Sequence, residues 1–105
     1  MKTDRLLRLQ QMLESAPSDP FLLFAVAKEY EKTGQLQQAL DHYNAVENAD
    51  PQYVGLYYHK GKLQEHQQQK TAAIATYRKG IEVAMAAGDR HAAAELQGAL
   101  TEAED

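Results

Sequence analysis

Apolar residues recur along the chain at the spacing of one helix face, in segments that end at turn residues. The clearest segment begins at Asp19, which can cap a helix that has Pro20 in its first turn. It ends at Gly34, since glycine adopts left-handed backbone at low cost. Its apolar stripe, at i, i+3, i+4 and i+7, consists of Leu23, Val26, Ala27 and Tyr30. This pattern predicts an amphipathic helix.

A second apolar stripe follows the first, and the pair of stripes is repeated 34 residues later. The second stripe of the first pair runs from Leu36 to Val46 and stops at Pro51, because proline cannot continue a helix. A shift of 34 residues superimposes Leu23 on Tyr57, Ala27 on Gly61, Ala39 on Ala73, Leu40 on Ile74 and Tyr43 on Tyr77. An internal period of this length predicts helix-turn-helix units that stack on one another.

The period accounts for nearly the whole chain. It predicts an N-terminal helix over 3–15, a first repeat over 20–50, a second repeat over 54–87 and a C-terminal capping helix over 90–103. The N-terminal helix is in phase with the second helix of a repeat. We therefore expect a single all-α domain over 1–105, with about six helices in antiparallel pairs and no strands.

Composition and charge exclude several classes of function. The 105 residues include no cysteine, which excludes disulfides, thiolate metal sites and a cysteine nucleophile. A net charge of -4 gives nucleic acid no electrostatic reason to bind. No apolar run approaches the roughly 20 residues of a membrane span, and residues 1–5 lack the apolar region of a signal peptide. We expect a cytoplasmic protein with no nucleic-acid or membrane partner.

Residue types that perform catalysis or bind metals form no recognised motif. His59 and His66 lie on one expected helix about 10 Å apart along its axis, too far to share a metal ion. Ser15 and Ser18 lie in a turn, where helix capping and turn formation explain them. No phosphate-binding or nucleophile motif occurs. We expect no enzyme, no metal and no cofactor.

The spacing within each repeat resembles that of the tetratricopeptide-repeat family, whose pattern is W-x2-L-G-x2-Y, then A-x3-F, then P. The first repeat matches it with Leu23, Val26, Ala27, Tyr30, Ala39, Tyr43 and Pro51. The second keeps the small residue, the alanine and the aromatic but departs at Lys60, Gln64 and Met85. Its turn, residues 67–69, is three glutamines without glycine, which predicts a less sharply defined turn. The resemblance implies a right-handed superhelix of stacked helix pairs that acts in protein–protein interaction.

A second stripe on the first helix of each repeat is the candidate binding surface, because the resemblance places first helices on the concave side. The stripes consist of Phe21, Phe24, Lys28 and Glu31 in the first repeat and of Gly55, Tyr58, Lys62 and Glu65 in the second. Aromatic rings supply contact area at low entropic cost, and lysines can pair with a ligand carboxylate. The alternative is packing, with Phe21 and Phe24 against the N-terminal helix and Tyr58 against the C-terminal one.

Family members that bind chaperone tails hold a peptide carboxylate with Lys and Asn of one first helix, Asn of the next and basic residues of the third. Here Phe24 and Lys28 stand at the first two positions, and Ala92 and Leu96 lie on the third helix, so this clamp is mostly missing. We predict a non-enzymatic adaptor that binds a peptide or protein surface in the concave groove. The alternatives are a self-associating structural unit and a small chaperone-like repeat protein.

Overall fold

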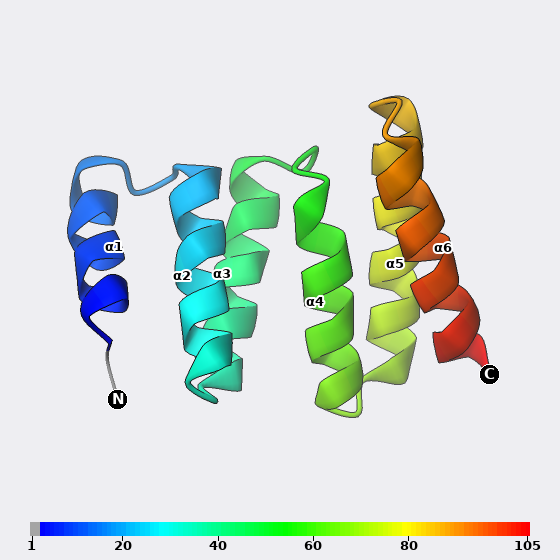
Figure 1. Ribbon diagram of the computed structural model, residues 1–105, viewed down its shortest axis with the longest axis horizontal. Helices are drawn as coiled ribbons and strands as arrows, with labels where there is room; N and C mark the ends of the chain where they lie inside the picture. The colour runs from blue at the N-terminus through cyan, green and yellow to red at the C-terminus, as the bar shows by residue number, and fades with distance from the viewer. Residues whose placement is uncertain (1–2) are drawn as a thin grey trace. The chain divides into compact units, whose positions relative to one another are not determined.

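The computed structural model describes residues 3–105, which form six helices and no strand (Figure 1). The chain divides after Pro51 into two compact units. The first contains α1 (Asp4–Ser15), α2 (Pro20–Lys32) and α3 (Leu36–Ala49); the second contains α4 (Gly55–His66), α5 (Lys70–Ala86) and α6 (Arg90–Glu104). The predicted all-α architecture is confirmed. Residues 1 and 2 of the domain expected over 1–105 lie outside the described residues.

Three helices begin at side chains that accept hydrogen bonds from the first turn. The hydroxyl of Thr3 accepts from the backbone of Leu6 at 3.0 Å and starts α1. Asp19 accepts from the amide of Phe21 at 2.9 Å and starts α2, and Asp89 caps α6 in the same way. These caps satisfy donors that have no partner within a helix. The cap predicted at Asp19 is confirmed.

The turns after α2, α4 and α5 share one geometry, although only two of them contain glycine. Gly34, Gln68 and Gly88 all adopt left-handed backbone, with φ of 79°, 63° and 73°. In each turn the following residue donates its N–H to the carbonyl five residues before it, at 2.8 to 2.9 Å. This pattern satisfies carbonyls at a helix end. The glutamine turn is therefore closed as tightly as the glycine turns, contrary to the expectation for residues 67–69.

Placing glycine in the turn after α4 and glutamine in the turn after α2 should change the free energy of unfolding in opposite directions. Left-handed backbone costs a non-glycine residue about 1–2 kcal/mol, partly offset by the greater freedom of glycine in the unfolded chain. Gln68→Gly should therefore raise the free energy of unfolding by about 1 kcal/mol, and Gly34→Gln should lower it by a similar amount. Urea denaturation monitored by circular dichroism measures both. Equal stability of the two variants would contradict the assigned backbone.

Paired helices approach closely where a small residue faces an aromatic ring. A Cβ atom added to Gly61 on α4 would lie 2.2 Å from Cε1 of Tyr77 on α5. A Cβ added to Gly80 on α5 would lie 2.4 Å from the Cβ of Tyr57. Ala27, which corresponds to Gly61 in the first repeat, is fully buried. Close packing explains both glycines.

The second repeat departs from the family pattern at Gln64, and a second difference, at Thr76, compensates for it. The first repeat places the rings of Tyr30 and His42 5.2 Å apart. The second repeat has Gln64 and Thr76 at these positions, and the buried threonine hydroxyl donates to the Gln64 side chain at 2.6 Å. A ring contact is thus replaced by a buried hydrogen bond, which satisfies both polar groups.

Two glycines inside helices should respond to alanine in opposite ways. Gly61→Ala should destabilise the protein by about 1–3 kcal/mol, because the new methyl group overlaps the Tyr77 ring. Gly98 on α6 is the matched control, since a Cβ there meets nothing within 4 Å. Gly98→Ala should stabilise by about 0.5–1 kcal/mol through helix propensity. Thermal melting measures both, and a neutral Gly61→Ala would mean that α4 and α5 are not paired at this contact.

Candidate protein-binding surface

An aromatic ring and a lysine form the same pair on the first helix of each repeat. Lys28 Nζ lies 5.8 Å from the ring centre of Phe24 on α2, and Lys62 Nζ lies 5.6 Å from that of Tyr58 on α4. The four-residue spacing places each lysine over its ring. Within residues 3–105 neither lysine forms an ion pair. Each repeat thus presents a cation without an acidic partner beside an aromatic face.

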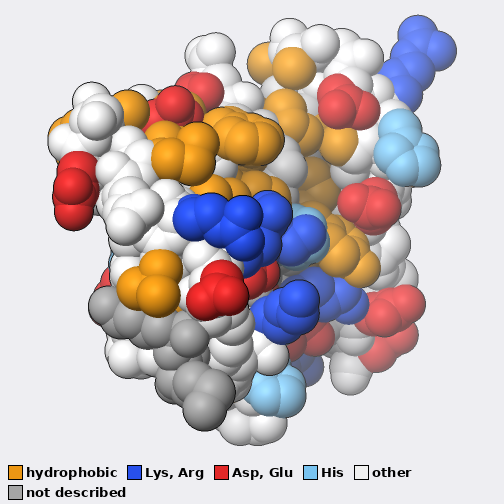
Figure 2. Space-filling view, turned by 60° about the vertical axis from the view of Figure 1, so that its left-hand side comes forward, with side chains coloured by type: hydrophobic (Ala, Val, Ile, Leu, Met, Phe, Trp, Pro, Cys, Tyr) orange, Lys and Arg blue, Asp and Glu red, His pale blue; other side chains and the backbone are white. Residues whose placement is uncertain are grey.

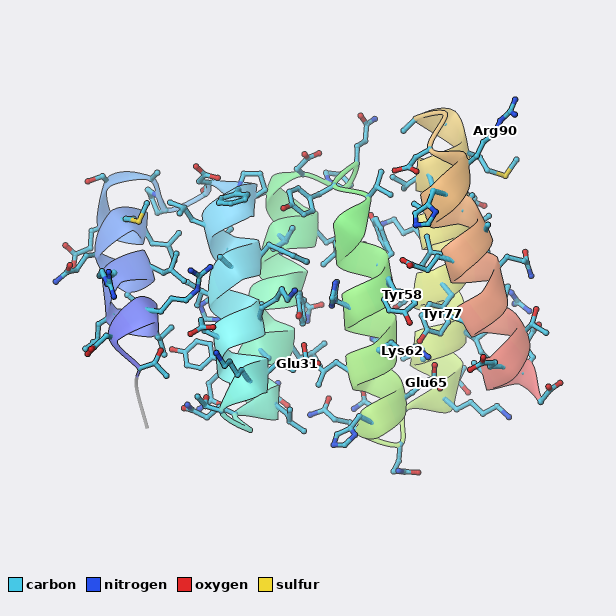
Figure 3. All side chains as sticks on the ribbon, viewed as in Figure 1. Glu31, Tyr58, Lys62, Glu65, Tyr77 and Arg90 are labelled. Carbon is cyan, nitrogen blue, oxygen red and sulfur yellow. The ribbon has the colours of Figure 1, made fainter. Side chains whose placement is uncertain are left out.

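The acidic members of the two stripes have a partner inside their own repeat. Tyr43 donates its hydroxyl to Glu31 at 2.7 Å, and Tyr77 donates to Glu65 at 2.5 Å. Figure 3 shows Tyr77 and Glu65 close together beside α4. Burial, then the hydrogen bond to the glutamate and its charge, raise the pKa of Tyr43 and Tyr77 far above the usual range. The two glutamates therefore join first and second helices.

Three stripe residues of the first repeat surround one hollow in the first unit. The hollow has a volume of about 340 Å³ and lies between α1 and α2. It is lined by Arg5, Phe21, Phe24, Ala25, Lys28 and Glu29. Phe21 is 66% exposed, while Phe24 packs against the Tyr43 ring of α3 at 5.8 Å. In Figure 2, which brings the side of α1 forward, Lys and Arg side chains lie next to hydrophobic ones.

Arg5 also lines this hollow, although it was not among the residues predicted from the sequence. Arg5 lies on α1, whereas the stripe was traced along α2 alone. The signal was present in the 34-residue period, which makes α1 the second helix of a preceding unit and so a neighbour of α2.

A buried carboxylate holds α1 against α2 beneath the hollow. Glu29 is only 7% exposed, and its Oε1 accepts the Thr3 hydroxyl at 3.2 Å while Arg5 Nε lies 3.7 Å from its Oε2. Gln10 on α1 also donates to the hydroxyl of Tyr30 at 3.0 Å. The second repeat has buried Leu63 at the position of Glu29. The attachment of α1 to α2 therefore includes a buried carboxylate and two side-chain hydrogen bonds.

The stripe of the second repeat borders a hollow at its acidic member. Glu65 lines a hollow of about 230 Å³, together with Gln68, Lys70, Glu102 and Ala103. Tyr58 and Lys62 lie outside that lining, and the ring of Tyr58 is 5.9 Å from that of His59. Gly55 is exposed at the start of α4. Tyr58, Lys62 and Glu65 lie along one side of α4 (Figure 3), and only Glu65 among them lines this hollow.

Two further observations concern the described part of the chain. Between Thr3 and Asp105, no group of three or more His, Asp or Glu side chains is arranged to hold a metal ion. None of the six helices combines the length and apolar character that a membrane span requires.

Comparison with known proteins identifies the family. A sequence profile described as tetratricopeptide repeat matches residues 54–84. The solution structure of a tetratricopeptide repeat domain protein from Salinibacter ruber is 43% identical, with 84% of this chain and 89% of that chain covered and a TM-score of 0.80. The chain belongs to the tetratricopeptide-repeat family. No curated protein sequence is significantly similar to it.

Other tetratricopeptide-repeat and related structures are similar over nearly the whole chain. Protein BPP2914 from Bordetella parapertussis is 28% identical, with 99% of this chain and 90% of that chain covered and a TM-score of 0.83. The TPR2B domain of yeast Sti1, solved in complex with pHsp70, has a TM-score of 0.88 with 94% of this chain and 79% of that chain covered. At 19% identity the Sti1 domain shows the common fold alone.

The two buried tyrosines should make the protein sensitive to alkaline pH. The unfolded chain loses a tyrosine proton near pH 10, whereas folded Tyr43 and Tyr77 keep theirs to higher pH. Their stabilisation is therefore complete below about pH 10 and falls above it by about 1.4 kcal/mol per pH unit for each tyrosine. Tyr77→Phe should remove one of the two contributions. Urea denaturation from about pH 8 to about pH 11.5 tests this, and an unchanged slope in the variant would contradict it.

Proposed function

We propose that this tetratricopeptide-repeat protein is a non-enzymatic cytoplasmic adaptor that binds a peptide or protein surface through the first helices of its repeats. The main supporting observation is the aromatic–lysine pair, which recurs at the same position of both repeats. Each lysine lies over its ring and has no acidic partner among residues 3–105. A positioned cation beside an aromatic face is suited to a partner that offers a carboxylate next to apolar groups.

The stripe residues divide between binding and positioning in this proposal. Phe21, Lys28, Tyr58 and Lys62 contact the partner. Glu31 and Glu65 hold second-helix tyrosines and orient the first helices, because their carboxylates accept the hydroxyl hydrogen bonds. Fold neighbours that bind other proteins, such as the Sti1 domain in its complex with pHsp70, are consistent with this role.

Capture experiments with matched double variants test the adaptor function. Immobilised wild-type protein should retain a partner from a lysate of the cells that produce it, and the double variant Tyr58→Ala/Lys62→Ala should retain at least about tenfold less. Lys79→Ala/Met85→Ala is the control, since it removes an exposed lysine and an exposed apolar residue from α5. Circular dichroism verifies that each variant remains folded.

Two results would contradict the adaptor function. The first is capture that is lost in the α5 control and retained in the α4 variant, which would place the binding surface elsewhere. The second is no captured partner together with a light-scattering mass of two or more chains, which would support a self-associating unit.

A further inference from the structure

We propose that the hollow between α1 and α2 binds a partner segment in which an Asp or Glu side chain adjoins a large apolar side chain. This inference rests on the proposed adaptor function and adds the chemistry of the partner. The occupant is an internal peptide segment, held by Arg5 and Lys28 at its carboxylate and by Phe21 and Phe24 at its apolar side chain.

The walls of the hollow are apolar and open to a ligand. Phe21, Phe24 and Ala25 all come from one face of α2, and Phe21 exposes two thirds of its surface. Phenylalanine is among the aromatic residues that are enriched at protein–protein interfaces. A volume of about 340 Å³ is at the small end of ligand sites and accommodates one large side chain and its neighbour.

The charges around the hollow favour an anion. Arg5 and Lys28 contribute two positive charges, and Glu29 contributes one negative charge beneath them. Both carboxylate oxygens of Glu29 are engaged, one by the hydroxyl of Thr3 and one by Arg5. Lys28 has no acidic partner in the described part of the chain. One positive charge therefore remains uncompensated, and a carboxylate placed between the two cations would neutralise it.

The geometry favours a side-chain carboxylate over the carboxylate of a chain terminus. One recurring way to bind a terminal carboxylate uses backbone N–H groups that form a concave nest. The N–H groups that begin α2 beside the hollow, those of Phe21 and Leu22, already donate to Asp19 at 2.9 and 3.4 Å. The hollow therefore offers side-chain cations to its ligand, which suits an acidic residue within a segment.

A synthetic peptide tests the inference directly. The probe is fluorescein-labelled and C-amidated, and it has the core Phe-Asp-Leu-Glu between Gly-Ser flanks; binding is followed by fluorescence anisotropy. One control peptide replaces Asp and Glu by Asn and Gln, and another replaces Phe and Leu by Ser. Each control should bind at least about tenfold more weakly than the probe, because each lacks one half of the recognised chemistry. A free C-terminal carboxylate should not strengthen binding.

Protein variants locate the site. Lys28→Gln and Arg5→Gln should each weaken probe binding about tenfold, while Arg5→Lys should retain most of it because the charge remains. Lys32→Gln is the matched control, since Lys32 is an exposed lysine at the end of α2 and outside the hollow. Added salt should weaken binding to wild-type protein, since the paired charges are exposed. Thermal melting separates loss of binding from release of α1 in Arg5→Gln.

Four outcomes would overturn the inference: no probe binding, equal binding of the acidic and amide peptides, equal loss in Lys32→Gln and Lys28→Gln, or preference for a free terminus. Failure of the adaptor function is read out separately, by capture from lysate with the α4 variant. If that capture depends on Tyr58 and Lys62 while the probe does not bind, the adaptor function stands and the inference about the hollow is wrong.

Discussion

The close contact between a small residue on one helix and a tyrosine ring on the next determines how the helices of each repeat pair and which side chains they expose. Gly61 leaves room for Tyr77, and Ala27 and Tyr43 occupy the same positions 34 residues earlier. In this position each tyrosine hydroxyl donates a hydrogen bond to a glutamate of the first helix, Glu31 in the first repeat and Glu65 in the second. A single steric fit thus sets the distance between paired helices and the direction in which each first helix faces.

The same contact engages one glutamate of each first helix and leaves the lysine of that helix available to a ligand. Glu31 and Glu65 are held by the tyrosine hydroxyls, and Lys28 and Lys62, one turn before them, form no ion pair within residues 3–105. An unpaired lysine over an aromatic ring is therefore a by-product of how the repeat is closed. Because the repeat occurs twice, the chain presents this arrangement twice.

Local patterns predicted the helices well because each one depends on residues close in sequence. Periodicity predicted the six helices, and a cap at Asp19 and a glycine at position 34 marked the two ends of α2. The site was harder, because Arg5 approaches α2 from another helix and the roles of Glu31 and Glu65 depend on tyrosines across a turn. The left-handed Gln68 was unpredictable for a different reason: closure of the turn imposes that backbone on a residue that does not prefer it.

The contacts that hold α1 against α2 are partly polar, and the same two helices form the hollow. The packing of α1 and the occupancy of the hollow are therefore linked. α1 rests on α2 through the buried carboxylate of Glu29 and the amide of Gln10, together with a short apolar face. Segments held in this way open more readily than a fully apolar core. The hollow exists only while α1 is docked, so any ligand that fills it must also slow hydrogen exchange of the α1 amides. Occupancy of the hollow by a ligand and the stability of α1 are therefore thermodynamically coupled, and each can be measured through the other.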